Sequence, residues 1–141
     1  MLNHPLIQKY IAANNFGQEL GMVFTIDSDG HVNHTLKIKE KHLATPIAAH
    51  GGVVSAMMDA TMGVCALLEA VNEDMVVSTL EMKISFISPA KMNDQLIGNS
   101  RLVKKGKRLL FLEGEIKNSS GKLVAMATGT FNVYPFEKAG F

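Results

Sequence analysis

The sequence predicts an α+β fold, in which a mostly antiparallel β-sheet wraps around one long central helix and a short helix precedes both. Two observations carry this prediction. Residues 53–68 are apolar at all but a few positions, a run too long for a buried strand and typical of a helix enclosed on every side. Four strand-like segments then follow without an intervening helix. Strands that are grouped in this way favour an antiparallel sheet.

The remaining elements follow in order along the chain. Asn3-His4-Pro5 predicts the start of a short amphipathic helix capped by Asn3 or His4, with Gly17 just past its end. The turn residues 27–30 separate an apolar run, residues 20–26, from an alternating run, residues 32–38, which indicates a hairpin. Beyond the central helix, strands are expected at residues 76–86, 95–103, 109–117 and 123–134, the last three joined by turns at 105–107 and 118–121.

Composition excludes several classes of protein. The chain has 141 residues, 47% of them hydrophobic, and a formal net charge of +1. These values fit a single domain, residues 1–141, and exclude a disordered chain or a general nucleic-acid binder. One Cys excludes an intrachain disulfide and a multi-Cys zinc site. The absence of an apparent leader peptide predicts a cytoplasmic protein, and the apolar run, interrupted by Asp59, is too short for a membrane span.

Asp59 is the most informative residue. A carboxylate at the centre of a buried helix costs several kcal/mol unless it is paired or hydrogen-bonded. Ser55, Asp59 and Gly63 are spaced four residues apart, so they form one small, polar seam on the apolar helix. Such a seam can admit a ligand or a second subunit. The alternative is that Asp59 only fixes a neighbouring backbone N–H, and this feature alone favours neither interpretation.

His50-Gly51-Gly52 directly precedes the predicted helix. Unpaired N–H groups and the positive end of the helix dipole favour an anion there, and two glycines let a ligand approach the backbone closely. Backbone donors can stabilise a developing oxyanion, while the Asp59 carboxylate can act as general base or nucleophile. Together these parts indicate acyl transfer.

His50-Gly51-Gly52 followed by Met58-Asp59 resembles the signature of hotdog-fold acyl-CoA thioesterases of the phenylacetate-pathway type. The resemblance extends over about residues 20–133 and includes residues 79–90, which match the family's strand after the helix, and the turn around Gly106. It implies a hotdog fold, an acyl-CoA substrate and no metal or redox cofactor. It also implies a homodimer with paired sheets and active sites at the interface, assembling into a homotetramer.

The resemblance also implies roles for individual residues. Asp59 matches the nucleophile or base, Gly51 with Gly52 matches the donor to the thioester carbonyl, and His50 matches a histidine that contacts that carbonyl. Thr79 matches a hydroxyl, supplied by the partner subunit, that places the attacking water. One position departs from the family: Ala44 stands where many members have Asn or Gln, and the Thr45 hydroxyl is a candidate substitute.

Five basic residues lie close together in the sequence: Arg101, Lys104, Lys105, Lys107 and Arg108. They are either a solvated hairpin tip or a site for the phosphates of CoA, and the resemblance favours the phosphate site. The other candidates are read as structural. Cys65 is expected to be an inert core thiol because it lies within the apolar helix. His31, His34 and His42 form no metal-ligand pattern with Asp59.

The sequence therefore predicts an acyl-CoA thioesterase that releases free acid and CoA. Two other functions remain open. One is an acyl-CoA-binding or sensing protein that has lost efficient catalysis, as Ala44 suggests. The other is a hotdog dehydratase acting on 3-hydroxyacyl thioesters, which is less favoured because such enzymes pair a loop His with a helix carboxylate in a different local motif.

Overall fold

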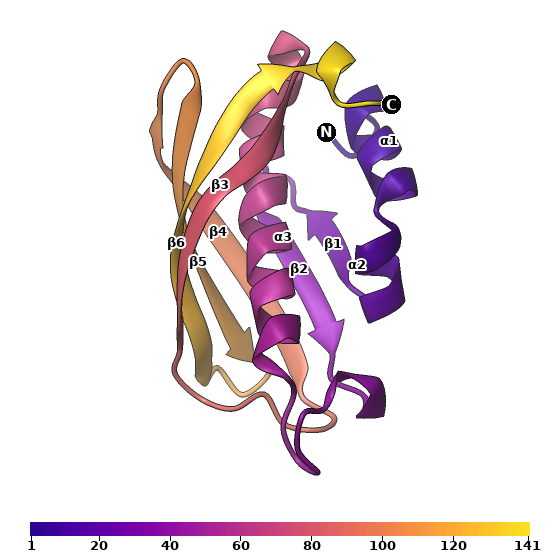
Figure 1. Ribbon diagram of the computed structural model, residues 1–141, viewed down its shortest axis with the longest axis vertical. Helices are drawn as coiled ribbons and strands as arrows, with labels where there is room; N and C mark the ends of the chain where they lie inside the picture. The colour runs from indigo at the N-terminus through magenta and orange to yellow at the C-terminus, as the bar shows by residue number, and fades with distance from the viewer.

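A computed structural model describes all 141 residues and confirms the predicted α+β hotdog fold. Six antiparallel strands form one sheet in the order β1-β2-β4-β5-β6-β3, which curls around the long helix α3 (Figure 1). The strands are β1 (Val23–Ile26), β2 (Val32–Lys37), β3 (Met75–Phe86), β4 (Gln95–Lys105), β5 (Leu109–Asn118) and β6 (Leu123–Pro135). The helices are α1 (Pro5–Ala13), α2 (Asn15–Leu20) and α3 (Gly51–Ala70), and α1 and α2 lie on the open side of α3 beside β1.

Helix α3 lies directly on the sheet because glycines in the strands leave room for it. A Cβ added at Gly114 would lie 2.9 Å from the Met58 sulfur, and one at Gly98 would lie 2.6 Å from the Thr61 hydroxyl oxygen. Flexible Met side chains fill the irregular space that remains, and Met58 is fully buried. This packing accounts for part of the large methionine content. By length and composition the segment Gly51–Glu73 could span a membrane, but its contacts with the sheet identify it as a core helix.

The expectation that α3 is enclosed on every side is wrong for the single chain. Gly51 and Gly52 are exposed, and the seam Ser55, Asp59 and Gly63 is only half-buried. The reason is geometric: the sheet covers the Met-rich face of α3, whereas the seam points away from the centre of the sheet. The apolar sequence predicted a fully buried helix, but in a single chain part of its surface stays exposed.

The N-terminal region contains two helices instead of the one predicted. The His4 imidazole caps α1 by accepting the Leu6 N–H at 3.2 Å. Asn14 then ends α1 and starts α2, because its side-chain oxygen accepts the Gly17 N–H at 3.0 Å. Gly17 was expected just past the helix end and is instead buried inside α2, which ends at Gly21 in a left-handed conformation.

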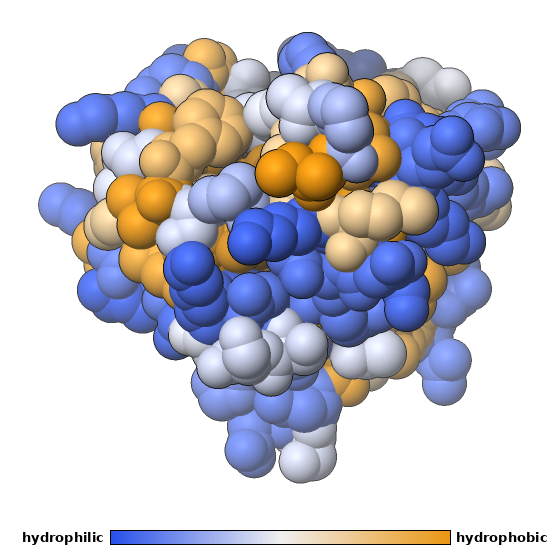
Figure 2. Space-filling view, turned by 90° about the horizontal axis from the view of Figure 1, so that it is seen from below, coloured by the Kyte–Doolittle hydropathy of each residue, from blue (hydrophilic) through white to orange (hydrophobic).

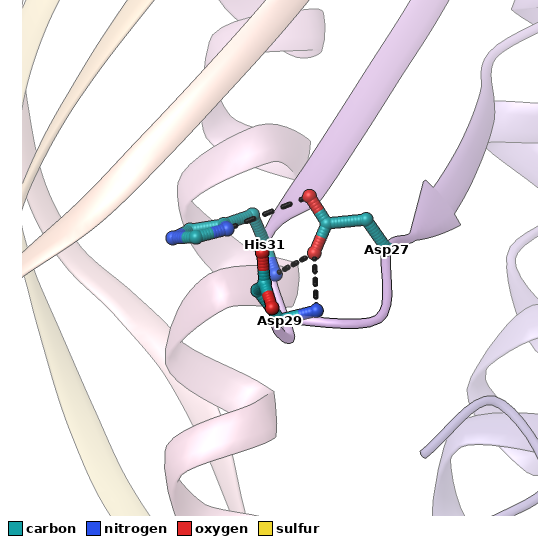
Figure 3. A group of neighbouring side chains, drawn as sticks. All are labelled: Asp27, Asp29 and His31. Atoms are coloured by element: carbon teal, nitrogen blue, oxygen red, sulfur yellow. Dashed lines mark hydrogen bonds and ion pairs between the residues drawn. The ribbon is translucent and has the colours of Figure 1, made fainter.

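The predicted turn at residues 27–30 joins β1 and β2. The Asp27 carboxylate accepts the backbone N–H groups of Asp29 and His31, each at 2.9 Å, and the His31 ring lies 3.4 Å from its other oxygen (Figure 3). The backbone hydrogen bond from His31 is the main reason that the pKa of Asp27 is lowered. These contacts are those of a side-chain-stabilised turn.

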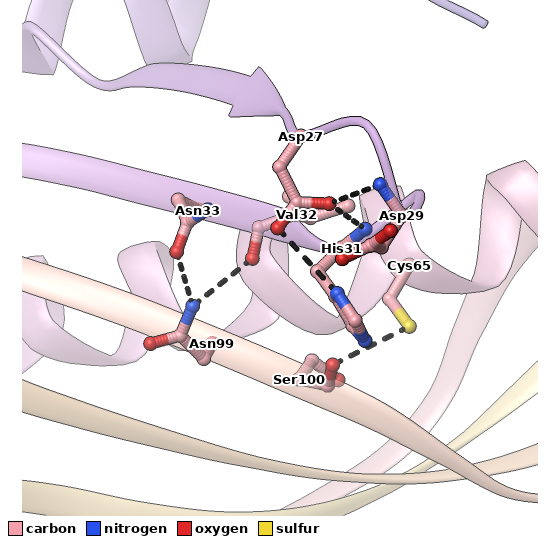
Figure 4. Close-up of polar contacts among 8 residues, drawn as sticks. All are labelled: Asp27, Asp29, His31, Val32, Asn33, Cys65, Asn99 and Ser100. Atoms are coloured by element: carbon pink, nitrogen blue, oxygen red, sulfur yellow. Dashed lines mark hydrogen bonds and ion pairs between the residues drawn. The ribbon is translucent and has the colours of Figure 1, made fainter.

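Polar contacts join β4 to β2 and to α3 (Figure 4). The Asn99 amide donates to the Val32 carbonyl at 3.2 Å and to the Asn33 side chain at 2.6 Å. The Cys65 thiol lies 3.8 Å from the Ser100 carbonyl. Burial raises the pKa of Cys65, which keeps it a thiol and agrees with the predicted structural role.

His34 on β2 is a buried histidine without a partner for its Nδ1 atom. It is 2% exposed, it packs against the Phe24 ring at 5.2 Å, and burial lowers its pKa to about 4. Protonation must therefore favour the unfolded chain, in which the pKa is near 6.5.

We expect the free energy of unfolding to be unaffected by His34 above pH 6.5 and to fall by about 3 kcal/mol as the pH drops from 6.5 to 4. His34→Leu should remove this part of the slope in urea titrations across the range. His31→Gln, at an exposed histidine, should keep it. Equal slopes for wild type and His34→Leu would show that His34 does not carry the effect.

Candidate active site

The Asp59 carboxylate lies near the middle of α3, at the edge of an apolar cavity. The Thr79 hydroxyl on β3 donates to its Oδ1 atom at 2.6 Å, a length typical of a strong bond to a charged oxygen. Both side chains line a cavity of about 310 Å³. Asp59 is therefore neither an unpaired core charge nor a cap for a backbone N–H, which was the structural alternative raised by the sequence.

Most of the cavity wall is apolar. Helix α3 contributes Asp59, Ala60, Gly63 and Leu67, and β3 contributes the residues from Val76 to Thr79. The opposite wall comes from Leu6 and Tyr10 of α1, and from Ala139 and Phe141 beyond β6. A single carboxylate at the edge of a mostly apolar space can hold a reacting polar group next to a bound apolar one.

Tyr10 is a cavity residue that the sequence did not single out. Burial raises the pKa of Tyr10, and the nearby Asp59 charge raises it further, so the phenol stays neutral. Its oxygen accepts a hydrogen bond from the Asn14 amide at 3.1 Å. Nothing in the local sequence marks Tyr10, because its approach to Asp59 depends on how α1 packs.

The predicted motif forms the N-terminus of α3. The His50 Nδ1 atom caps the helix by accepting the Gly52 N–H at 2.7 Å. A Cβ at Gly52 would lie 2.8 Å from that nitrogen, so glycine is needed there to seat the ring. The Gly52 N–H is thus occupied, contrary to its predicted role as a second donor. The Gly51 N–H has no partner within the chain and remains available.

Apolar side chains surround this free N–H group. Figure 2 views the end of the molecule where α3 begins, and apolar atoms lie there in patches among polar ones. The Phe86 ring would contact a Cβ at Gly51 at 3.6 Å, and Phe86 itself is 55% exposed. Ile47 and Ile87 are also exposed nearby. The N–H group therefore lies on an exposed, partly apolar surface of a single chain.

Gly51 and Asp59 are far apart within one chain. Gly51 and Asp59 are eight residues apart on a continuous helix, which corresponds to about 12 Å along the axis. A single carbonyl cannot reach both groups at hydrogen-bond distance. In a single chain, the predicted site is therefore divided into two half-sites: one at Gly51, and one formed by Asp59 and Thr79.

Thr79 was expected to approach Asp59 from the partner subunit, and the structure corrects this. The hydrogen-bonded Asp59 and Thr79 belong to the same chain. The pair meets because β3 follows α3 and lies beside it (Figure 1). The group that is distant from Asp59 is Gly51.

The loop before α3 uses the Thr45 hydroxyl in its own turn. Thr45 Oγ1 accepts the N–H groups of Ile47 and Ala48, the latter at 3.0 Å. Thr45 therefore stabilises the loop that leads into α3. Ser55 lies on α3 between the two half-sites and is half-buried, but it does not line the cavity.

The predicted basic cluster is divided by ion pairs. Arg101 binds Glu113 at 2.5 Å on β5, and Lys105 binds Glu73 at 3.0 Å and the Glu69 carbonyl at 2.8 Å. Lys104, Lys107 and Arg108 have no acidic partner. The hairpin tip lies beside Glu69 and Glu73, at the end of α3 opposite Gly51.

The chain is similar in sequence to a known family and to proteins of known name. The model of the thioesterase superfamily matches residues 48–125, which include Gly51, Asp59 and Thr79. Human acyl-coenzyme A thioesterase 13 is 29% identical over 127 residues, 89% of each chain.

Two solved structures are similar to the whole architecture. The PaaI protein from the phenylacetic acid degradation operon of Escherichia coli has a TM-score of 0.81 at 18% identity, covering 90% of this chain and 89% of that one, which shows the fold. A hypothetical thioesterase protein from Streptococcus pneumoniae TIGR4, solved with coenzyme A, has a TM-score of 0.70 at 26% identity, covering 82% of this chain and 87% of that one.

Proposed function

Because the chain belongs to the thioesterase superfamily and has the hotdog fold, we propose that it hydrolyses acyl-CoA to a free carboxylic acid and CoA through Asp59. The hydrogen bond between Thr79 and Asp59 at the edge of an apolar cavity carries this proposal. The cavity receives the acyl group, and its thioester carbonyl comes to lie beside the carboxylate. Thr79 fixes the orientation of Asp59 for the reaction.

Two routes use the same groups. As general base, Asp59 removes a proton from water while the water oxygen attacks the carbonyl carbon. As nucleophile, Asp59 attacks first and forms an anhydride that water then hydrolyses. In both routes the carbon–sulfur bond breaks, CoA leaves as a thiolate that is then protonated, and the carbonyl oxygen becomes negative in the transition state.

That developing charge needs a donor, and the free Gly51 N–H is suited to this role. It lies at a helix N-terminus, where the dipole favours negative charge. Since about 12 Å separate Gly51 and Asp59 along one helix, the proposal requires two chains: Asp59 and Thr79 from one, and Gly51 from a second copy.

Strand β3 provides the surface for this pairing. It is the edge strand of the sheet next to β6, and its other edge has no partner. It is 12 residues long, and Leu80 on it is 58% exposed. A long, partly apolar edge strand readily pairs with another chain. Pairing β3 with β3 about a two-fold axis sets the two α3 helices antiparallel, so that the Gly51 end of one moves towards Asp59 of the other.

A binding-only protein is the second candidate, and Ala44 is the observation that favours it. Thiol release from a panel of acyl-CoAs, followed with a thiol-reactive dye, is measured beside thermal shift with the same ligands. Hydrolysis supports the proposed function. Thermal stabilisation without thiol release would support binding alone, and hydration of an enoyl-CoA would instead indicate a dehydratase.

The three basic residues without acidic partners are proposed to bind the phosphates of CoA. We expect Lys107→Gln combined with Arg108→Gln to raise KM for an acyl-CoA about 30-fold, with kcat little changed, because two charge-assisted contacts of about 1 kcal/mol each are lost. Lys122→Gln, in the turn between β5 and β6, is the control for loss of a positive charge at another hairpin turn. For a truncated thioester without phosphates, the double variant should have the same KM as the wild type. A similar rise in KM for the truncated thioester would contradict phosphate binding.

A further inference from the structure

We infer that the cavity beside Asp59 is an acyl slot bounded at its far end by residues 136–141 and along its side by α1, so that the enzyme selects acyl groups of medium length. This inference rests on the proposed function. It concerns only which acyl-CoAs the site accepts, and it assigns the selection to Tyr10 and Phe141, which lie far from Asp59 in the sequence.

The slot begins at Asp59 and runs towards the C-terminal end of α3. Its lining residues on the helix start at Asp59 and end at Leu67, which are eight residues apart, or about 12 Å along the axis. An extended chain advances about 1.2 Å for each single bond, as the polypeptide backbone does. The slot therefore holds about ten bonds of an extended acyl chain. A palmitoyl chain is longer than this.

The far end of the slot is closed by the segment that follows β6. The Phe136 N–H donates to the Asp74 carbonyl at 3.1 Å, which anchors the segment next to the end of α3. Gly140 adopts a φ of +80°, and the turn it makes brings Phe141 back onto the Phe136 ring, with centroids 5.7 Å apart. Phe141 and Ala139 then line the cavity.

Helix α1 closes the slot from the side and is joined to this segment. Leu6 and Tyr10 occupy successive turns of α1 and both line the cavity. The Lys9 ammonium lies 4.8 Å above the Phe136 ring, a cation–π contact. Figure 1 shows α1 and the end of the chain side by side near the C-terminal end of α3. The two walls therefore support one another.

The volume agrees with the length. At about 310 Å³ the cavity is near the lower end of the range of about 300–1,000 Å³ for ligand pockets. An acyl group of medium length fills it, whereas a two-carbon group leaves most of the apolar wall without contact. Shorter groups are disfavoured because apolar contact with the wall supplies the binding free energy. Longer groups are disfavoured because they exceed the length of the slot.

The test is kcat/KM for acetyl-, hexanoyl-, decanoyl- and palmitoyl-CoA, the last below its micellar concentration. Wild type should prefer hexanoyl or decanoyl and should use palmitoyl at least tenfold less well. Tyr10→Ala and Phe141→Ala should each raise the palmitoyl to decanoyl ratio about tenfold or more by opening the slot. Tyr10→Phe should keep the wild-type ratio, because the ring remains.

Phe16→Ala is the matched control. Phe16 is an exposed aromatic residue on α2, 64% accessible, that does not line the cavity, so its loss should leave the ratio unchanged. Phe141 is itself 56% exposed, so Phe141→Ala should fold normally even if Tyr10→Ala does not.

Two results would overturn the inference: wild type that uses palmitoyl-CoA as well as decanoyl-CoA, or ratios unchanged in both opening variants. If wild type hydrolyses no acyl-CoA, the proposed function fails, and thermal shift with the same four thioesters tests the slot separately. Thermal stabilisation that is greatest for acyl groups of medium length then supports the acyl slot. Stabilisation that does not depend on acyl length contradicts it.

Discussion

Asp59→Asn is expected to lower kcat for acyl-CoA hydrolysis by about 10²–10⁴-fold, the contribution typical of a positioned acid or base. Asparagine has the shape of aspartate and can still accept the hydrogen bond from Thr79. It can neither take a proton from water nor attack a carbonyl at a useful rate. The substitution therefore removes the chemistry while leaving the cavity nearly unchanged.

Steady-state thiol release at saturating substrate measures this loss, and thermal unfolding of the same samples checks the fold. Asp29→Asn makes the same chemical change at an exposed position in the turn between β1 and β2, and it should keep wild-type kcat. If Asp59→Asn turned over substrate as fast as wild type, Asp59 would be neither base nor nucleophile.

Gly51→Pro is expected to have the next largest effect, a fall in kcat of about 10²–10³-fold, because it removes the proposed oxyanion donor. Proline is tolerated at the first position of a helix, where its missing N–H has no helical partner. His50 already has the extended conformation that a following proline requires, with φ −61° and ψ 136°. The substitution thus keeps the start of the helix and replaces the N–H hydrogen by a CH2 group of the proline ring.

Gly51→Ala is the control, because it keeps the N–H and adds a Cβ at an ordinary 3.6 Å from Phe86. We expect Gly51→Ala to retain most of the wild-type kcat and Gly51→Pro to lose it, with similar melting temperatures for both. Equal activity of the two variants would rule out this N–H as the donor.

Mixing the two inactive variants tests whether the site is shared between chains. In a two-fold dimer with composite sites, one Asp59→Asn chain and one Gly51→Pro chain form one doubly altered site and one intact site. A refolded equal mixture should then recover about a quarter of wild-type activity, since half of the dimers are mixed and half of their sites are intact. A site contained in one chain would recover nothing. Light scattering of wild type measures the dimer, and the predicted homotetramer, directly.

Local patterns were sufficient to predict most of the fold. The apolar run after Gly51-Gly52 forms α3, and the alternating segments form strands within a few residues of their expected ends. These elements were predictable because the hydrophobic periodicity of a helix or strand is a local property of the sequence. The second N-terminal helix was missed because Asn14 ends one helix and caps the next, and Gly17 resembled a stop signal.

The candidate site was predicted as a set of residues but not as an arrangement. Asp59, Gly51 and Thr79 were identified from their chemistry and from a family resemblance. The occupied Gly52 N–H depends on the rotation of the His50 ring, and the ion pairs of Arg101 and Lys105 depend on strand register and on the end of α3. None of these is visible in the spacing of residues.

The amino-acid pattern was enough to predict the architecture of this protein and to point to Asp59, because a carboxylate within an apolar helix needs a polar partner. Which residues lie together depends on the tertiary structure. Helical rise separates Gly51 from Asp59, the order of elements places Thr79 beside Asp59 in the same chain, and α1 and residues 136–141 supply one wall of the cavity. Distances between residues remote in sequence are set by packing, and packing is a property of the whole chain.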